Sequence, residues 1–314
     1  MTDRMTIAIC TYNRAERLMR LIRVLQEQAA GLPVDILVVN NNSTDHTEES
    51  VGTFLRSPGP PVWLVNEKTQ GIVHARNRAI EETLENAYMA FIDDDELPGK
   101  TWVRAAFDAL NREGAQCAGG RIDVRLPATS RPPWLEEGLL YFLGKVDNGP
   151  EPFWITGHST PVWSGNVAYR TSVFQEGLRF DRRYDRHGNE VGGGSDEILF
   201  RELLSRGARI RYRPDMAIEH LVDPWRLKRR YFLELHYKAG WKAGRWGEKT
   251  KERSVCGVPF FLFRHAYRQC VRAIPPFLLS RRGSIRLAMN SAHAIGMIVG
   301  KVQSWSNPSE SVVQ

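Results

Sequence analysis

The sequence predicts an α/β protein with a mainly parallel central sheet, flanking helices and a separate helical, basic C-terminal region. Short apolar runs alternate with helical patterns through the first half of the chain. Polar clusters follow these runs, at the strand ends where open α/β sheets place their ligand crevice. The charge is also unevenly divided between the two parts of the chain. Residues 221–314 contain 17 of the 43 Lys and Arg residues and 5 of the 36 Asp and Glu residues. Residues 1–220 contain the other 26 basic and 31 acidic residues. An acidic body therefore precedes a basic tail.

Apolar runs predict the strands of the first half, and a 3.6-residue periodicity predicts its helices. In chain order we expect a strand, a helix, two strands, a helix, a strand and a helix, at Met5–Cys10, Ala15–Gln28, Asp35–Val39, Val62–Val65, Val73–Glu85, Tyr88–Ile92 and Thr101–Arg112. Thr44 or Asp45 is expected to cap a further helix after the second strand.

The second half is less regular. Its expected strands are Gly119–Leu126, Asn166–Tyr169, Arg209–Tyr212 and Ala217–His220. Residues 131–163 are expected to be rich in loops, and the helix Ser195–Arg206 is expected to end at Gly207. In the tail, residues 260–274 form a helical pattern with arginines at every fourth position.

Length and composition exclude several classes of protein. A chain of 314 residues with 42% hydrophobic and 25% charged residues can bury a core and is not disordered. The four cysteines lack metal-site spacing, so we expect reduced thiols in the cytoplasm. Residues 287–300 are too short an uncharged run to span a bilayer, and no transmembrane segment is expected.

Three adjacent carboxylates, Asp93, Asp94 and Asp95, follow the apolar strand that ends at Ile92. Adjacent carboxylates repel one another by roughly 1 kcal/mol per pair in water, and by several-fold more where they are partly buried. A divalent cation such as Mg²⁺ or Mn²⁺ would relieve that repulsion and could be shared with the phosphates of a nucleotide. The alternative interpretation is a solvated acidic turn that caps the next helix.

Three further features are candidates for chemistry. Asp196 and Glu197 open a helix after a run of three glycines, either as a general base or only as acids that complement the helix dipole. Arg76 follows the turn at Gly71, either as an anion clamp or as a partner of a nearby helix glutamate. His220 ends an apolar strand, where a histidine is more often structural. Tryptophans in the loop-rich region could form a platform for a sugar ring, namely Trp134, Trp154 and Trp163.

Together these motifs resemble those of the family 2 glycosyltransferases, which are inverting, nucleotide-sugar-dependent enzymes of the GT-A fold. Their order and spacing match over about residues 5–220, and the continuation after residue 223 looks most like bacterial members that build exopolysaccharide units on a lipid carrier. The matching segments are Ile7–Arg14, Val38–Asp45, Gly71 with Ala75–Asn77, Phe91–Asp95, Gly165–Asn166 and Gly194–Glu197.

The resemblance implies a role for each matching position. The metal, Mn²⁺ or Mg²⁺, would be held by Asp95, Asp93 and His220. The catalytic base would be Asp196, with Glu197 as the fallback because Ser195 stands where the family usually has Glu-Asp. One further group of residues would bind the donor: Thr11, Tyr12, Arg14, Asn41, Arg76, Asp93 and Asp94. Another would bind the acceptor: Trp163, Gly165 and Asn166.

The same resemblance divides the chain into a GT-A catalytic domain, residues 1–222, and a helical basic region, residues 223–314. Within the first, residues 1–118 would be the nucleotide-binding half and residues 119–222 the acceptor-binding half. Members commonly have an aspartate, which pairs with the uracil imide N–H, where Asn40 or Asn41 stands. An amide oxygen can still accept that bond, so a UDP-sugar is the first expectation for the donor, and GDP- or dTDP-sugars are the next.

We therefore expect an inverting transferase that moves a sugar to a hydroxyl of a glycan or lipid-linked acceptor. The basic tail is expected to hold the enzyme at the anionic inner face of the membrane. Two alternatives remain open: a nucleotidyltransferase that makes the sugar nucleotide, although its phosphate loop is missing after the first strand, and a protein that binds nucleic acid through its basic tail. No nucleic-acid partner is expected, because the body is acidic.

Overall fold

The computed structural model describes residues 2–55, 57–128, 131–187, 190–247, 252–278 and 284–307. The chain divides into two compact units. Unit 1 comprises Met1–Leu126, Leu143–Glu190 and Gly194–Val222, and unit 2 comprises Pro127–Phe142, Val191–Gly193 and Asp223–Gln314. Residues 127–142, which the sequence analysis assigned to the catalytic domain, thus belong to unit 2.

The first half of unit 1 is a set of parallel strands in the order β3-β2-β1-β4, at Val62–Asn66, Val34–Asn40, Thr2–Thr11 and Asn86–Ile92. Helices connect them: α1 (Ala15–Ala29), α2 (Thr47–Gly52) and α3 (Ile72–Thr83). Because the strands are parallel, the carboxyl ends of β1, β2 and β4 meet at one edge of the sheet.

The second half extends the same sheet with the parallel pair β6 and β9 and with the antiparallel strands β5, β7 and β8. Beside β4 lies β8 (Asn166–Arg170), followed by β6 (Cys117–Arg125), β9 (Ile210–Leu221) and β5 (Glu96–Pro98), while β7 (Phe153–Ile155) pairs with β9. The sequence predicted two strands where the structure has the single strand β9. The pairing of β9 with β6 changes register: Gly120 of β6 pairs with Arg213, and Ile122 pairs with Ile218. The apolar pattern of β9 is interrupted at this irregularity, between Arg213 and Ile218.

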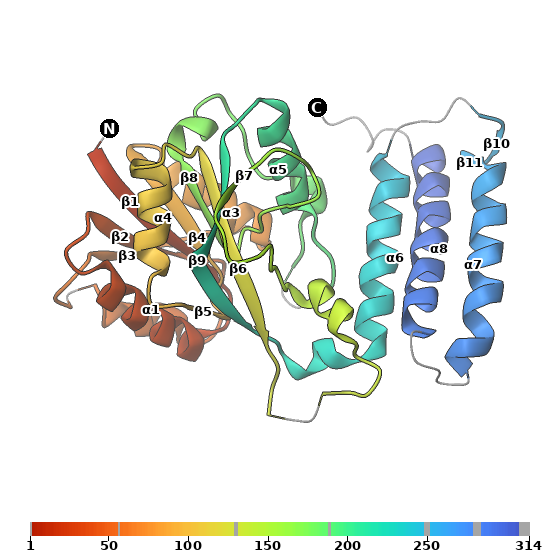
Figure 1. The fold of residues 1–314 in the computed structure, drawn as a ribbon, viewed down its shortest axis with the longest axis horizontal. Helices are drawn as coiled ribbons and strands as arrows, with labels where there is room; N and C mark the ends of the chain where they lie inside the picture. Colours follow the sequence, from red (N-terminus) through yellow and green to blue (C-terminus); the bar gives the residue numbers. More distant parts are fainter. Residues whose placement is uncertain are drawn as a thin grey trace. The chain divides into compact units, whose positions relative to one another are not determined.

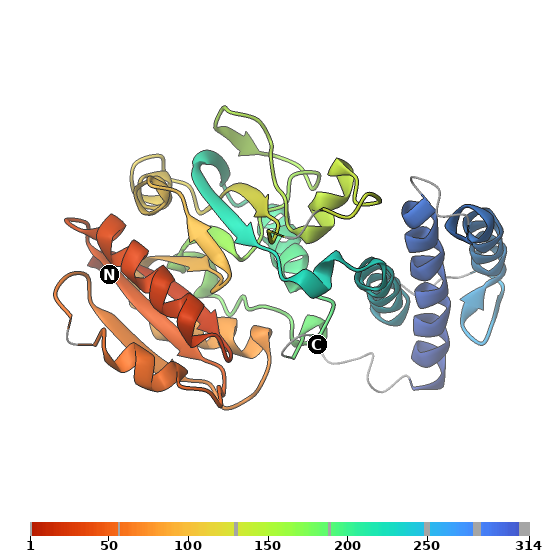
Figure 2. The ribbon, with the colours of Figure 1, turned by 90° about the horizontal axis from the view of Figure 1, so that it is seen from below.

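Helices cover both faces of the sheet (Figures 1 and 2). α1, α2 and α4 (Trp102–Asn111) pack on one face through a core that includes Leu18, Val51 and Trp102. On the other face, α3 and α5 (Ser195–Ser205) bury Ile80 and Phe200. The described residues also include four 3₁₀ helices, η1 (Glu137–Leu143), η2 (Thr171–Phe174), η3 (Arg182–Tyr184) and η4 (Pro224–Leu227).

The elements predicted for residues 5–112 are all present, with ends that shift by at most three residues. The prediction that Thr44 or Asp45 caps α2 is wrong, because the N-cap residue is His46; Asp45, one residue earlier, still accepts a hydrogen bond from the Thr47 backbone N–H at 3.1 Å. Helix α5 ends as expected before Gly207, which has a φ of 72°. All four cysteines are free thiols.

Unit 2 is helical, with α6 (Arg229–Trp246), α7 (Phe260–Leu278) and α8 (Ser284–Ser306), and with a hairpin of β10 (Ser254–Val255) and β11 (Val258–Pro259). Figure 1 shows α8 between α6 and α7. None of the helices in the described part of the chain combines the length and hydropathy needed to cross a membrane.

Glycines let α6 and α8 approach closely. A Cβ atom on Gly240 would lie 2.0 Å from the His293 carbonyl oxygen, and one on Gly296 would lie 2.1 Å from that of Tyr237. Gly244 and Gly300 are equally crowded, at 2.3 and 2.2 Å from backbone oxygens of the facing helix. The two helices therefore pack backbone against backbone, through a four-residue glycine spacing that the sequence analysis missed.

This packing can be tested with Gly296→Ala. Alanine normally favours a helix over glycine by about 1 kcal/mol, but here its Cβ meets backbone, so we expect a loss of about 1–3 kcal/mol in unfolding free energy. Gly52→Ala is the matched control, because a Cβ on Gly52 meets nothing within 4 Å. Thermal and urea melts followed by circular dichroism measure both. Equal stability of Gly296→Ala and the wild type would contradict the close packing.

Candidate active site

The ends of β1 and β4 bring together the predicted donor and metal residues. The Thr11 hydroxyl donates to Asp94 Oδ2 at 2.7 Å, and both side chains are buried. The Arg14 guanidinium lies 3.3 Å from Asp95 Oδ2 and 3.7 Å from Asp94 Oδ1. Tyr12 lies half-buried in the same turn. A cation and a hydroxyl thus partner two of the three adjacent carboxylates.

The next loops are locked by side-chain amides. Asn13 has a φ of 54°, and its Oδ1 accepts from the Thr44 N–H at 2.7 Å. The buried amide of Asn41 donates to the Thr69 carbonyl at 2.7 Å and accepts from the Gly71 N–H at 2.8 Å. Asn41 therefore braces the loop between β3 and α3, a backbone role that the sequence analysis did not foresee.

Asp185 fixes the start of α3. Its Oδ1 accepts from the Val73 N–H at 2.9 Å, which satisfies one of the unpaired amides at the helix N-terminus. Gly71 has a φ of 144°, and a Cβ there would lie 1.9 Å from Asp185 Oδ2, so only glycine fits the turn. No sequence motif pointed to Asp185, because its partner lies 112 residues away. The cap orients the helix that carries Arg76.

Arg76 joins the acids after β4 to the acid that opens α5. Its guanidinium is 4% exposed and lies 2.8 Å from Asp196 Oδ1 and 3.2 Å from Asp93 Oδ1. The Ser164 hydroxyl donates to the same Asp196 oxygen at 2.6 Å. Burial opposes the positive charge, but Asp196 and Asp93 outweigh it and raise the pKa of Arg76. Arg76 is predicted to lie near the base or the diphosphate of the nucleotide, and in the structure its guanidinium pairs with two carboxylates.

Two further acids of the site, Asp94 and Glu96, have raised pKa values. Burial, followed by the charge of Asp95, raises the pKa of Asp94 to about 7. Burial, then Asp93 and Asp95, raises the pKa of Glu96 well above its usual range. Glu96 Oε2 accepts from the Asp93 N–H at 3.0 Å. Glu96 continues the acidic run in the sequence, and the sequence analysis missed its part in the site.

His220 presents a ring nitrogen to Asp95. Its Nδ1 lies 2.7 Å from the Leu143 carbonyl oxygen, and because a carbonyl only accepts, Nδ1 must carry the proton. Nε2 is the ring nitrogen turned to the carboxylate, at 3.8 Å from Asp95 Oδ2. Gly144, with a φ of 99°, allows this approach, since a Cβ there would lie 3.1 Å from Nδ1.

An imidazole nitrogen and a carboxylate oxygen that face each other fit Mn²⁺ or Mg²⁺. The described residues contain no group of three or more His, Cys, Asp or Glu that could hold a metal ion, so a cation here would take its other ligands from phosphate oxygens and water. The Asp93 carboxylate is turned to Arg76, and we leave it out of the metal ligands.

The predicted acceptor residues are placed differently. Asn166 is 1% exposed; its Oδ1 accepts from Trp102 Nε1 at 2.7 Å, and its amide donates to the Met216 carbonyl at 2.9 Å. The Asn166 side chain is thus turned into the core, and a contact of this residue with the acceptor stays a prediction. A Cβ on Gly165 would lie 2.2 Å from Glu96 Oε1, so Gly165 makes room for that carboxyl group.

Two other predicted residues lie at the periphery of this network. Trp163 packs, partly buried, against the core and stays a predicted acceptor contact. Glu197 forms an ion pair with Arg201 at 2.6 Å, one turn along α5, and its side chain is about half exposed. Asp196 rather than Glu197 is therefore the α5 acid that joins the network around Arg76.

Arg76→Met tests that network. Removing the cation leaves the Asp93 and Asp196 carboxylates without their partner, so we expect a loss of about 3–5 kcal/mol in unfolding free energy. Arg78→Met is the matched control on the same helix; it breaks only an i,i+4 pair with Glu82 that is about one-third exposed, and should cost less than about 1 kcal/mol. Urea unfolding measures both, and equal losses would refute the assignment.

Asp94→Asn tests the raised pKa. The pKa of Asp94 is about 7 in the folded protein and near 4 in the unfolded chain. Between these pH values the folded protein holds a proton that the unfolded chain has lost. The wild type therefore loses stability as the pH rises from about 4 to about 7. Without metal, the stability of Asp94→Asn relative to the wild type should therefore increase from pH 4 to pH 7, by no more than about 4 kcal/mol. Urea unfolding across this range in EDTA measures it, and a flat difference would contradict the shift.

Comparison with known proteins supports one family. Residues 6–178 match the sequence model of "Glycosyl transferase family 2". Glycosyltransferase AglE of Haloferax volcanii is 28% identical over 123 residues, which are 39% of this chain and 40% of AglE. Succinoglycan biosynthesis protein ExoM of Rhizobium meliloti is 23% identical over 244 residues, or 76% of this chain and 74% of ExoM. The matched region of AglE is thus less than half of that relative.

Among solved structures, the mannosyltransferase PcManGT of Pyrobaculum calidifontis, in complex with GDP-Man and Mn²⁺, superposes with a TM-score of 0.56. The match covers 95% of this chain and 87% of PcManGT at 17% sequence identity. At that identity the likeness concerns the fold, and it confirms the predicted α/β architecture.

Proposed function

Because the chain belongs to glycosyl transferase family 2 and is a glycosyltransferase, we propose that it is an inverting enzyme that transfers a sugar from a nucleoside diphosphate to an acceptor hydroxyl. The single observation that carries this proposal is the Arg76 bridge, which ties the acid opening α5 to the acids that follow β4. An acid held in that position can serve as the base beside a nucleotide site, and family membership identifies the chemistry.

Asp196 is the proposed base. Its side chain is 20% exposed, enough to meet an acceptor hydroxyl, while Arg76 and Ser164 hold its orientation through one carboxylate oxygen. A single base that accepts the hydroxyl proton suits one in-line displacement with inversion. A retaining double displacement would need a second carboxylate as nucleophile. Asp93 is a poor candidate for that role because Arg76 binds both of its oxygens.

Asp95 and His220 are the proposed metal ligands, with Mn²⁺ or Mg²⁺ as the ion. A divalent ion bound there would stabilise the negative charge of the departing diphosphate as a Lewis acid. The chain's own part is to hold the His220 ring through the Leu143 carbonyl and to place Asp95 beside the Arg14 guanidinium.

The proposed donor pocket lies at the ends of β1 and β4, with Thr11, Tyr12, Arg14 and Asp94 around the nucleoside. A UDP-sugar is our first proposal, although the Asn41 amide is engaged by the backbone and is not the uracil-reading group that an aspartate would be. GDP-sugars are the next candidates, as the bound GDP-Man of PcManGT suggests. The acceptor would be a glycan or a lipid-linked sugar, met at the anionic inner face of the membrane.

A panel of UDP-, GDP- and dTDP-sugars tests the proposal. With Mn²⁺, we expect one class to be bound and slowly hydrolysed, and we expect Asp95→Asn to abolish the metal dependence. Asp196→Asn should lower turnover by about 10²–10⁴-fold, the range for loss of a general base, with donor affinity unchanged. Donor hydrolysis and thermal shift measure these effects.

Glu197→Gln is the matched control, because it removes the neighbouring acid, whose partner is Arg201. It should keep turnover within about threefold of the wild type, well short of the loss expected for a general base. If no donor binds in a metal-dependent way, the proposal fails. If Glu197→Gln is the inactive variant, the base is wrongly assigned.

A further inference from the structure

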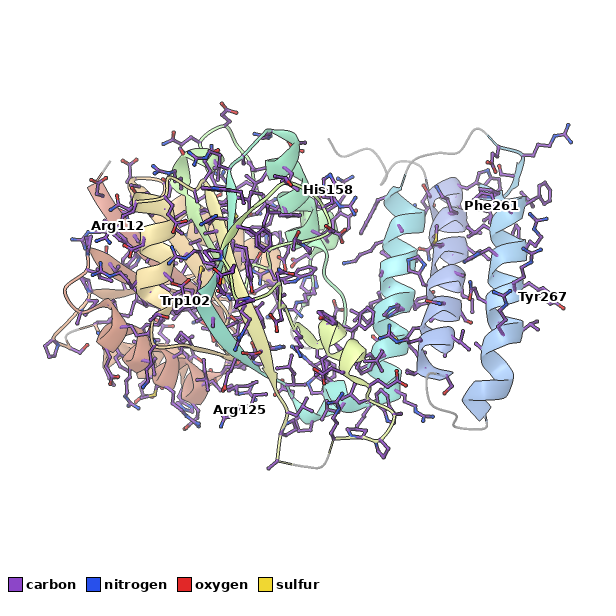
Figure 3. All side chains as sticks on the ribbon, in the orientation of Figure 1. Trp102, Arg112, Arg125, His158, Phe261 and Tyr267 are labelled. Atoms are coloured by element: carbon purple, nitrogen blue, oxygen red, sulfur yellow. The ribbon has the colours of Figure 1, made fainter. Side chains whose placement is uncertain are left out.

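One long face of α7 exposes large apolar side chains. Phe260, Phe263, Tyr267 and Val271 fall on one stripe at helical spacing, and their exposed fractions are 58%, 41%, 70% and 51%. The opposite side of the helix buries small or aliphatic residues such as Leu262 and Ala266. Figure 3 shows Tyr267 projecting from α7 on the side away from α8. These aromatic rings serve no core in the described chain.

A row of arginines runs beside that stripe. Arg264, Arg268 and Arg272 are exposed and repeat every four residues. None of them has a carboxylate partner among the residues that the structure describes, and neither α7 nor α8 contains an Asp or a Glu. The surface is therefore apolar and positive, with no acid of its own.

Two more exposed apolar side chains lie in the hairpin that precedes α7 and near the end of α8. Val255 of β10 is 48% exposed, and Trp305 near the end of α8 is 60% exposed. The two belong together in space, because a Cβ on Gly257, in the hairpin turn, would lie 2.7 Å from the Trp305 side chain. We call the stripe, the three arginines, Val255 and Trp305 the α7 surface.

We propose that the α7 surface docks on an anionic lipid bilayer, with the helix lying in the plane of the interface. Charge complementarity selects this occupant: arginines that lack acidic neighbours meet lipid phosphates, while the adjacent aromatic side chains enter the headgroup region. A protein partner would normally find charges of both signs to fix its register. This inference names the surface that makes the membrane contact of the proposed function. It depends on the proposed function only in one respect, that membrane binding brings the enzyme to a lipid-linked acceptor.

The test is co-sedimentation of the full chain with vesicles of phosphatidylcholine alone or of equal parts phosphatidylcholine and phosphatidylglycerol. The wild type should sediment with the anionic vesicles only. Since each basic residue near such a surface contributes about 1 kcal/mol, R264Q/R268Q/R272Q should weaken this binding about a hundredfold. F263S/Y267S, which keeps every charge, should weaken it as well.

The matched control is R104Q/R112Q/R125Q, which removes three arginines of unit 1 that are more than half exposed. It should bind vesicles like the wild type. Equal sedimentation with neutral and anionic vesicles, or an equal loss in the control, would overturn the proposal. So would a wild type that is dimeric by light scattering, binds no vesicles and becomes monomeric in F263S/Y267S, since the surface would then join two copies.

Donor hydrolysis in vesicle-free solution keeps this test separate from the proposed function. R264Q/R268Q/R272Q should hydrolyse the donor at the wild-type rate, because the three arginines belong to unit 2 and the site residues belong to unit 1. A chain that binds vesicles without turning over any donor supports the α7 surface and rejects the proposed function. A chain that turns over donor without binding vesicles supports the proposed function and rejects membrane docking by the α7 surface.

Discussion

The site of this protein depends on one buried guanidinium. Arg76 faces Asp93, which follows β4, and Asp196, which opens α5, although these acids are separated by more than one hundred residues in the chain. Without a cation between them, two carboxylates could not share this partly buried edge of the sheet. The bridge has a cost, because Arg76 Nε is buried and has no hydrogen-bond partner among the described residues. Such a cost is typical of a position fixed by the site rather than by packing.

The acids that Arg76 does not reach are neutralised in another way. Asp94 and Glu96 hold protons more tightly than free carboxyl groups do, because both are buried beside ionised neighbours. A proton and a divalent cation can therefore relieve the same repulsion, and binding of the cation must displace protons from this cluster. The Asp95–His220 pair is suited to receive the cation, since the Leu143 carbonyl holds Nδ1 and leaves Nε2 turned toward the carboxylate.

The parallel half of the fold could be predicted from the sequence because its signals are local. Apolar runs and helical periodicity mark β1 to α4, and the acids that follow β4 lie at a strand end that the pattern itself defines. The strands β5 and β7 have three residues each and show no period, so only their pairing with β9 reveals them. Ser164 and Asp185 were missed, and the core contacts of Asn166 were not foreseen, because hydrogen bonds to distant residues fix these side chains.

The exposed rings of α7 follow from the way unit 2 is packed. Glycines bring α6 and α8 into backbone contact, an interface in which large side chains have no place. The rings of α7 are 41–70% exposed, and each would gain part of the about 1.5–3 kcal/mol that full burial supplies. That stabilisation is recovered only when something apolar covers the helix. Since arginines without acidic partners border the rings, the covering surface must be apolar and negative together, and an anionic bilayer offers both at one depth.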